Sequence, residues 1–168
     1  MNAQDLAIIA LGSNVGDSQS ILVGAMDCLA ALSAKPLLKS SLWQTTPVDC
    51  PPGSPMFLNA VVGLVPQPDE TPELLLAKLF QIEKDFGRKP RSIRNEPRRL
   101  DLDLITYGSE IRTTEWLTLP HRRAHERRFV LHPFSEIAPD HILPGQQKTV
   151  VELLAALGPG EKLVRLNT

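Results

Sequence analysis

Aspartate and leucine alternate along residues 100–104, and this alternation leaves the local backbone few options. A period of two residues is typical of a β-strand that buries one face. Asp101 and Asp103 would project from the same face, with Cα atoms about 6.5 Å apart. Carboxylates this close repel each other unless a cation lies between them, and Mg²⁺ typically binds one or two carboxylates together with substrate phosphates. A solvated strand face is the alternative interpretation of this pair taken alone.

Basic residues are concentrated around this strand. Arg98 lies three residues before Asp101, and eleven of the 18 Lys and Arg residues fall within residues 88–128. The chain as a whole carries a formal net charge of −1, so the basic field is local. Such a field suits a small polyanion better than a nucleic acid, although some of these arginines are expected only to solvate loops. Carboxylates for a metal beside guanidinium groups for phosphate indicate phosphoryl transfer.

The composition limits the class of protein. With 168 residues, of which 42% are hydrophobic and 22% charged, the sequence fits one soluble domain over residues 1–168. No apolar run approaches the roughly 18 residues needed to cross a membrane. The start of the sequence lacks the basic segment of a secretory signal. Cys28 and Cys50 do not show metal-ligand spacing, so we expect two reduced thiols and a cytoplasmic location.

Hydrophobic periodicity and turn signals predict the order of the elements. Strands are expected at residues 6–11, 37–46 and 57–65 and at the aspartate pair, with a turn at residues 12–14 and loops at residues 46–55 and 88–99. Two helices are expected, one capped by Asp17 or Ser18 with Cys28 in its apolar stripe, the other capped by Thr71 and closed by Gly87. Further expectations are a hairpin partner for the aspartate strand at residues 111–119, a short helix at residues 129–138, a helix at residues 150–157 capped by Thr149, and a closing strand at residues 162–166.

This order predicts an α+β fold with a ferredoxin-like βαββαβ core. In that arrangement helices pack on an antiparallel sheet. The remaining strands and helices would follow the core as C-terminal additions.

Several short motifs occur in one order along the chain. They are Gly12-Ser13-Asn14, Phe57-Leu58-Asn59, Glu83 with Gly87-Arg88, Pro97-Arg98-x-x-Asp101-Leu102-Asp103, and Pro120-His121 ending in Arg127-x-Phe129. Together they resemble 6-hydroxymethyl-7,8-dihydropterin pyrophosphokinase, the folate-pathway enzyme family that moves pyrophosphate from ATP to a pterin hydroxymethyl group. The resemblance spans nearly the whole chain, and the expected elements match the ferredoxin-like core of that family.

The resemblance implies a role for each matching residue. Asp101 and Asp103 would hold two Mg²⁺ ions against the triphosphate of ATP, while the pterin hydroxyl attacks the β-phosphorus and AMP leaves. Catalytic phosphate contacts are implied for Arg88, Arg98, His121 and Arg127. Nucleotide contacts are implied for Glu83, Arg88, Arg91, Arg98, Leu104, Thr118, His121, Arg122 and Arg127. Pterin contacts are implied for Thr46, Pro47, Asp49, Phe57, Asn59 and Phe129, with the amide reading the heterocycle and the rings stacking on it.

The chain also departs from the pattern of the family. Asn95-Glu96 stands where a tryptophan normally closes over the pterin, and Pro90 stands where a phosphate-gripping arginine is common. Phe80, Trp116 and Arg122 also replace usual residues. One alternative is therefore a divergent paralogue that binds pterin or nucleotide with altered or no catalysis.

An RNA-binding ferredoxin-like domain is a further alternative. It would require paired aromatics in a basic, glycine-containing strand, and the sequence has no such run. We expect small-molecule substrates, no nucleic acid or membrane partner, and a monomer.

Overall fold

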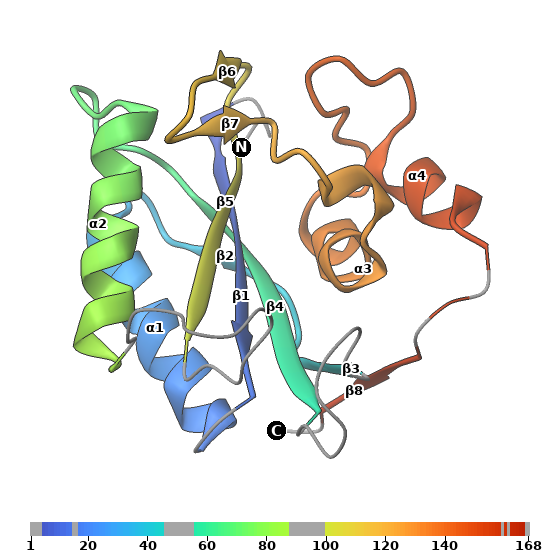
Figure 1. Ribbon diagram of the computed structural model, residues 1–168, viewed down its shortest axis with the longest axis horizontal. Helices are drawn as coiled ribbons and strands as arrows, with labels where there is room; N and C mark the ends of the chain where they lie inside the picture. Colours follow the sequence, from blue (N-terminus) through green and yellow to red (C-terminus); the bar gives the residue numbers. More distant parts are fainter. Residues whose placement is uncertain are drawn as a thin grey trace.

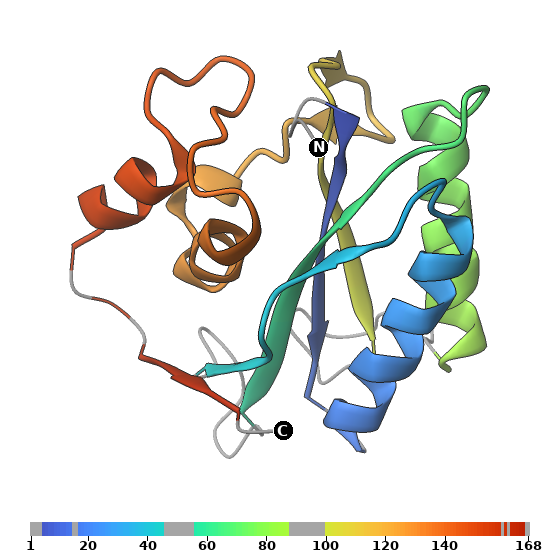
Figure 2. The same cartoon turned by 180° about the vertical axis from the view of Figure 1, so that it is seen from behind.

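A sheet separates two helical layers in this protein (Figures 1 and 2). The computed structural model describes residues 5–14, 17–45, 56–87, 100–158, 160 and 162–166. One face of the sheet packs against α1 (Ser18–Leu32) and α2 (Pro72–Asp85). The other face packs against α3 (Arg128–Ile137) and α4 (Val150–Ala156).

Six of the described strands form an antiparallel sheet in the order β5-β1-β4-β3-β8, with β2 also paired to β4. Their bounds are β1 (Ala7–Ser13), β2 (Leu38–Lys39), β3 (Trp43–Thr45), β4 (Phe57–Leu64), β5 (Asp101–Tyr107) and β8 (Leu163–Arg165). The first strand of the βαββαβ unit lies between the third and the last, and both helices of the unit lie on one face. The predicted ferredoxin-like core is confirmed, and the closing strand joins the sheet beside β3.

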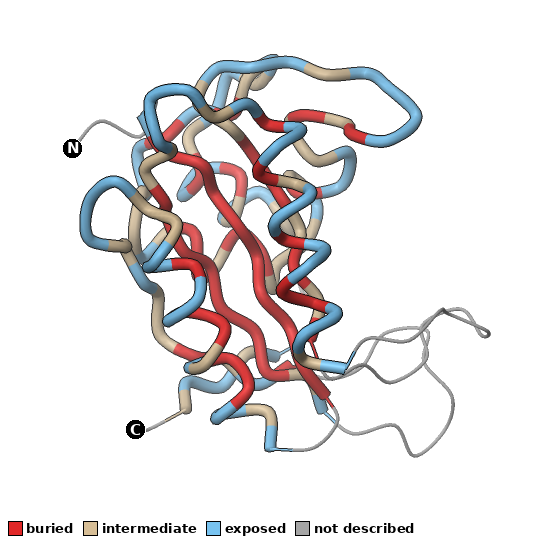
Figure 3. Tube along the Cα trace, turned by 90° about the vertical axis from the view of Figure 1, so that its left-hand side faces the viewer, coloured by how far each residue is buried: buried red, intermediate tan, exposed pale blue. Residues whose placement is uncertain are grey.

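Alternation along β1 divides its side chains between two hydrophobic cores. Ile9 and Leu11 point toward α1 and α2, whereas Ile8 and Ala10 point toward α3. Figure 3 shows the central strands as long buried segments between helices with exposed outer sides. Because β1 is buried on both faces, its sequence is a continuous apolar run, as is typical of an interior strand.

The helix caps are those that the sequence predicts. Asp17 accepts a hydrogen bond from the Ser20 amide at 3.2 Å, and Thr71 accepts one from the Leu74 amide at 3.2 Å. Thr149 forms a capping box with Glu152 at the start of α4. Caps depend on residues three positions apart, so they can be recognised without tertiary information.

Three local predictions were wrong. The turn expected at residues 12–14 does not form at Gly12 and Ser13, because β1 continues through both residues. Gly12 pairs with β4 and β5, and Ser13 pairs with β4. The strand expected at residues 37–46 is two short strands, separated where the Ser40 hydroxyl accepts the Val61 amide at 2.9 Å. Cys28 is exposed, and Met26 takes the buried position on α1.

The prediction that residues 111–119 pair with the aspartate strand as a hairpin was also wrong. β6 (Arg112–Thr113) pairs with β7 (Thr118–Leu119) in a separate two-stranded sheet. The outer edge of β5 is instead bound by a side chain and by one loop amide. Glu83 of α2 accepts the Leu102 amide at 2.7 Å, and the His121 amide donates to the Ile105 carbonyl at 2.8 Å. These two contacts satisfy backbone groups of β5, which is an edge strand of the sheet.

Within the part of the chain that the structure describes, no helix is long and apolar enough to cross a membrane.

Candidate functional site

Strand pairing places Asp101, Gly12 and Asn59 side by side across three neighbouring strands, in what we call the transverse row. Gly12 of β1 pairs with Asp101 of β5 on one side and with Asn59 of β4 on the other. Directly paired residues direct their side chains to the same face of an antiparallel sheet. Asp101 and Asn59 therefore both face α3, with Cα atoms about 10 Å apart across two strand spacings.

Gly12 provides the space between these two side chains. A Cβ atom at this position would lie 3.1 Å from Oδ1 of Asn59. The Asn59 amide therefore lies over β1, and its Nδ2 donates to Thr45 Oγ1 at 2.8 Å. Asn59 is only 6% exposed, so its amide is held in one orientation.

The predicted aspartate pair lies on this same face. Asp103 pairs with Ala10, whose side chain belongs to the α3 core, and Asp101 pairs with Gly12 one step further along β1. Both aspartates are partly exposed, whereas Leu102 and Leu104 between and beside them are buried on the opposite face. The alternation predicted for residues 100–104 is confirmed.

Two basic residues, His121 and Arg127, lie in the segment that follows β7 and interact electrostatically with the aspartates. Burial lowers the pKa of the Arg127 guanidinium, and the charge of Arg123 lowers it further, whereas Asp103 and Asp101 raise it. Burial likewise lowers the pKa of His121, as does the charge of Arg127, and Asp101 opposes them. These mutual effects place His121 and Arg127 in the electrostatic field of the aspartate pair.

A hydrogen bond determines which nitrogen of His121 carries the proton. Its Nδ1 accepts the Arg123 amide at 3.2 Å. With its pKa lowered, the imidazole is neutral at pH 7, so Nε2 carries the proton. His121 can therefore donate one hydrogen bond from Nε2.

The aromatic residues implied by the resemblance border the row. Phe57 lies two residues before Asn59 on β4, so both side chains project from the α3 side of the sheet. Phe129 is half-buried at the start of α3 and packs against the core on that side. The Arg127 guanidinium carbon lies 5.5 Å from the centroid of the Phe129 ring, within cation–π range.

Other residues implied by the resemblance have different surroundings. The Leu104 side chain is buried in the core beneath α1 and α2, so only its backbone could reach a ligand on the α3 side. Thr118 is half-buried in β7, and Arg122 is exposed. Glu83 is 3% exposed and binds the Leu102 amide, between the two aspartates.

Several predicted residues lie outside the described residues. They are Thr46, Pro47, Asp49, Arg88, Arg91 and Arg98, together with the departures at Pro90 and Asn95.

The donor chemistry of the row fits a hard divalent cation. Asp101 and Asp103 supply carboxylate oxygens on one face. No group of three or more His, Cys, Asp or Glu side chains that could hold a metal ion gathers anywhere in the described ranges, this site included. Two protein carboxylates suffice for Mg²⁺ when substrate phosphates supply further oxygens. A zinc site would instead need more nitrogen or sulfur ligands.

Sequence reasoning missed three residues beside this site. Trp43 extends the transverse row, because it pairs with Asn59. His132 and Glu136 of α3 contact Trp43. A polar-apolar alternation along β3 could have suggested that Trp43 faces inward, but no sequence signal connects it to α3.

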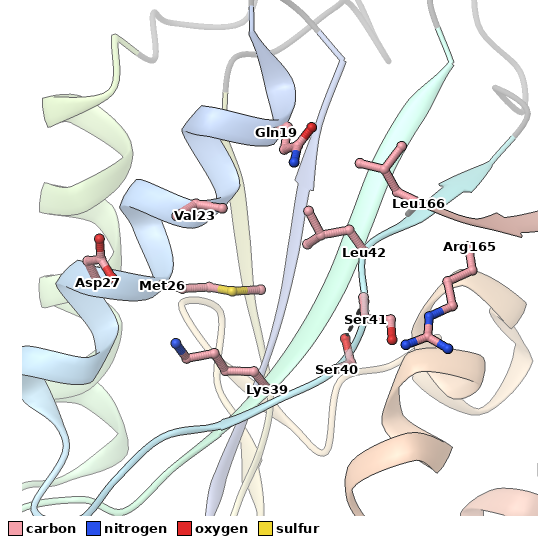
Figure 4. Close-up of a pocket in the computed structure, with 10 residues that line it drawn as sticks. All are labelled: Gln19, Val23, Met26, Asp27, Lys39, Ser40, Ser41, Leu42, Arg165 and Leu166. Carbon is pink, nitrogen blue, oxygen red and sulfur yellow. Dashed lines mark hydrogen bonds between the residues drawn. The ribbon is translucent and has the colours of Figure 1, made fainter. Parts of the chain in front are cut away.

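A pocket of about 260 Å³ lies away from the row. It opens between α1 and the β2–β3 segment, over Met26 and Leu42, with Lys39 and Arg165 at its rim (Figure 4). None of the residues that the sequence analysis assigned to a site lines this pocket.

Comparison with known proteins identifies relatives over most of the chain. A family model described as 7,8-dihydro-6-hydroxymethylpterin-pyrophosphokinase (HPPK) matches residues 8–139. A Methylorubrum extorquens protein named 2-amino-4-hydroxy-6-hydroxymethyldihydropteridine pyrophosphokinase is 40% identical over 153 residues, which cover 91% of this chain and 94% of the relative. A Haemophilus influenzae protein of the same name is 38% identical over 162 residues, which cover 96% of this chain and 98% of the relative.

Two solved structures with the same fold are structures of HPPK-DHPS chains. An HPPK-DHPS structure in complex with substrates matches with a TM-score of 0.65 and 12% identity, covering 90% of this chain and 43% of that one. A Plasmodium falciparum HPPK-DHPS structure matches with a TM-score of 0.69 and 14% identity, covering 89% of this chain and 45% of that one. This chain thus spans less than half of those chains, and at these identities the likeness shows the fold alone.

Proposed function

The chain belongs to the 7,8-dihydro-6-hydroxymethylpterin-pyrophosphokinase family, and we propose that its reaction takes place on the α3 side of the sheet, along the row from Asp101 to Asn59. The protein is a pyrophosphokinase that transfers pyrophosphate from ATP to hydroxymethyldihydropterin in folate synthesis. The observation that carries the proposed location is the register of β1. It places the Asp101 carboxylate and the Asn59 amide on one face, with Gly12 between them.

Asp101 and Asp103 hold two Mg²⁺ ions in this proposal. Their shared face, partial exposure and hard oxygen atoms support the assignment. Bound Mg²⁺ would neutralise phosphate charge and favour ionisation of the attacking hydroxyl. The protein contributes mainly by positioning the reactants and the charges around them.

His121 and Arg127 contact the nucleotide phosphates on the side of the departing AMP. A guanidinium donates charge-assisted hydrogen bonds to phosphate oxygens, and a neutral imidazole donates one from Nε2. Both groups lie in the field of the aspartates, which supports a shared phosphate site. By resemblance, Arg88, Arg91, Arg98, Thr118, Arg122 and the backbone of Leu104 complete the nucleotide contacts.

Asn59 reads the pterin, and the rings of Phe57 and Phe129 stack on it. The Asn59 amide is buried and oriented, which supports recognition of a heterocycle with donors and acceptors on one edge. The family pattern adds Thr46, Pro47 and Asp49 to this subsite. A pterin at Asn59 would direct its hydroxymethyl group across Gly12 toward Asp101.

A single domain, a monomer and a cytoplasmic location complete the proposal. The described elements pack on the two faces of one sheet, which supports a single domain over residues 1–168. The free thiol of Cys28 is consistent with a reducing compartment.

The decisive experiment measures AMP release from ATP, Mg²⁺ and 6-hydroxymethyl-7,8-dihydropterin. Asp101→Asn and Asp103→Asn should each lower kcat by about 10³-fold, because each removes charge that would hold a metal ion. Asp140→Asn, at an exposed position after α3, serves as the matched control and should retain full activity.

Other products would contradict parts of the proposal. Release of ADP would mean attack at the γ-phosphorus. Mg²⁺-dependent pterin binding without AMP release would favour the divergent, binding-only paralogue. Full activity in both aspartate variants would exclude the metal assignment.

A further inference from the structure

One carboxylate of α3 gathers three hydrogen bonds from the segment that contains β3. Glu136 accepts the Ser41 amide at 3.0 Å, the Ser41 hydroxyl at 2.8 Å and the Trp43 indole N–H at 2.7 Å. Both carboxylate oxygens are used, so the side chain is held in one orientation. These bonds join residues more than 90 positions apart and connect the α3 layer directly to the sheet.

The indole of Trp43 makes a second contact with the same helix. Its ring meets the His132 ring edge-on, with centroids 4.3 Å apart and planes at 79°. Such edge-to-face pairs have a preferred geometry and separation. Trp43 is thereby held by two residues on successive turns of α3.

Trp43 is also the neighbour of Asn59 in the sheet. The two residues pair directly between β3 and β4, so their side chains lie next to each other on the α3 side. Thr45, two residues along β3, accepts the hydrogen bond from the Asn59 amide. The strand that orients Asn59 is therefore the strand that binds α3.

Phe129 lies on the face of α3 that these contacts hold. Phe129, His132 and Glu136 are spaced at i, i+3 and i+7, which places them on one side of a helix. Pro133 has no N–H, so the Phe129 carbonyl lacks its helical donor four residues later. The first turn of α3 therefore depends on tertiary contacts for its position.

Charge strengthens this arrangement. Although burial raises the pKa of Glu136, the hydrogen bonds from Trp43 and Ser41 and the charge of Arg165 leave that pKa lowered. Arg165 pairs with Trp43 from β8, and Figure 4 shows its guanidinium directed toward Ser41. Glu136 is thus ionised at neutral pH, the form that accepts all three bonds.

We propose that Trp43 and Glu136 form a positioning pair that sets the distance between Phe129 on α3 and Asn59 on β4, and so determines how well the pterin ring fits between them. This inference rests on the proposed function, in which Phe129 and Asn59 contact the pterin. Neither member of the pair needs to touch the substrate. The pair controls the pterin subsite without affecting the nucleotide subsite at Asp101 and Asp103.

Two variants distinguish an effect on pterin binding from a general effect on folding. Trp43→Phe keeps an aromatic ring beside His132 and removes the N–H donor, whereas Glu136→Ala removes the acceptor at an exposed position. Each should raise the KM for pterin about fivefold, the factor expected from the loss of one net hydrogen bond. The KM for ATP and kcat should change by less than about twofold. The variants weaken pterin binding equally in the ground state and in the transition state, and they do not alter ATP binding. Glu136→Gln keeps an acceptor oxygen and should restore most of the pterin affinity.

The matched control is Glu152→Ala. It breaks the capping box of α4 and should lower the melting temperature without altering the KM for pterin. The inference is overturned if Trp43→Phe and Glu136→Ala behave like this control. It is also overturned if they raise the KM values for ATP and pterin equally.

Calorimetry distinguishes this inference from the proposed function. If the wild-type protein released no AMP, the proposed function would fail, and pterin titration into the wild type and both variants would still test the pair. Weaker binding in the variants supports the pair. Equal binding, or no pterin binding by the wild type, overturns it.

Discussion

At the scale of single residues, Gly12 has a role that its sequence context did not reveal. The motif around it is typical of a turn, yet Gly12 pairs within the sheet and adjoins both Asp101 and Asn59. Glycine is required here by a close approach of a side chain, since a Cβ atom would meet Oδ1 of Asn59 at 3.1 Å. The absence of a side chain keeps the path between amide and carboxylate open.

Gly12→Ala should therefore impair pterin binding more than folding. The methyl group would displace the Asn59 amide by a few tenths of an ångström. We expect the KM for pterin to rise about threefold to tenfold, and the free energy of unfolding to change by less than about 1 kcal/mol. Steady-state kinetics with each substrate varied, together with urea unfolding, would measure both quantities. An unchanged KM for pterin would show that the amide does not read the ring.

At the scale of elements, the outer edge of β5 explains how the aspartates are held. An edge strand exposes unpaired amides and is free to twist. Here α2 supplies a carboxylate to the Leu102 amide, midway between Asp101 and Asp103. The helix that begins at Thr71 and Pro72 thus ends close to the strand whose geometry it controls.

Replacing Glu83 should loosen this edge. Glu83→Ala leaves the Leu102 amide without its acceptor, so we expect the free energy of unfolding to fall by about 2 to 4 kcal/mol. Glu83→Gln retains an acceptor oxygen and should lose less than half of that amount. Gln81→Ala, at an exposed site on the same helix, is the control. Hydrogen exchange of the Leu102 amide should accelerate in Glu83→Ala. Unchanged exchange would contradict an edge-capping role.

At the scale of the whole molecule, the sheet divides two cores of different character. The core under α1 and α2 consists of aliphatic and aromatic side chains from those helices and the sheet. The core under α3 and α4 borders a buried histidine, His141, whose ring stacks on Phe134 with centroids 5.7 Å apart. Burial lowers the pKa of His141, and its Nε2 has no hydrogen-bond partner among the described residues.

His141 should make the protein less stable in acid. Its folded-state pKa lies below the ordinary value, so the unfolded state binds more protons once the pH falls below about 6.5. The free energy of unfolding should be constant above that pH and decline below it, until the folded-state pKa is passed. His141→Phe keeps a stacking ring without a titrating group and should flatten this decline. Urea unfolding at pH 7.5 and 5.5 would measure the effect. His125→Gln is the control, and an equal decline in His141→Phe would refute the assignment.

Local patterns were sufficient for much of this protein. The caps at Asp17, Thr71 and Thr149 and the alternation around Asp101 depend on residues a few positions apart, so each could be predicted from the chain itself. The order of the expected strands and helices likewise predicted the ferredoxin-like core. Residues 37–46 were harder, because a break in a strand depends on how the neighbouring strand accommodates it.

The sequence by itself determined the order of the main helices and strands and that Asp101 and Asp103 share a face, because helix and strand periodicity are properties of short segments. Only the tertiary structure decided that Gly12 separates Asp101 from Asn59, that Glu83 supports β5, and that Trp43 binds α3. Each of these depends on strand register or on packing between layers. Register is set by the burial of whole strand faces across the sheet, and no local pattern encodes which distant residues it brings together.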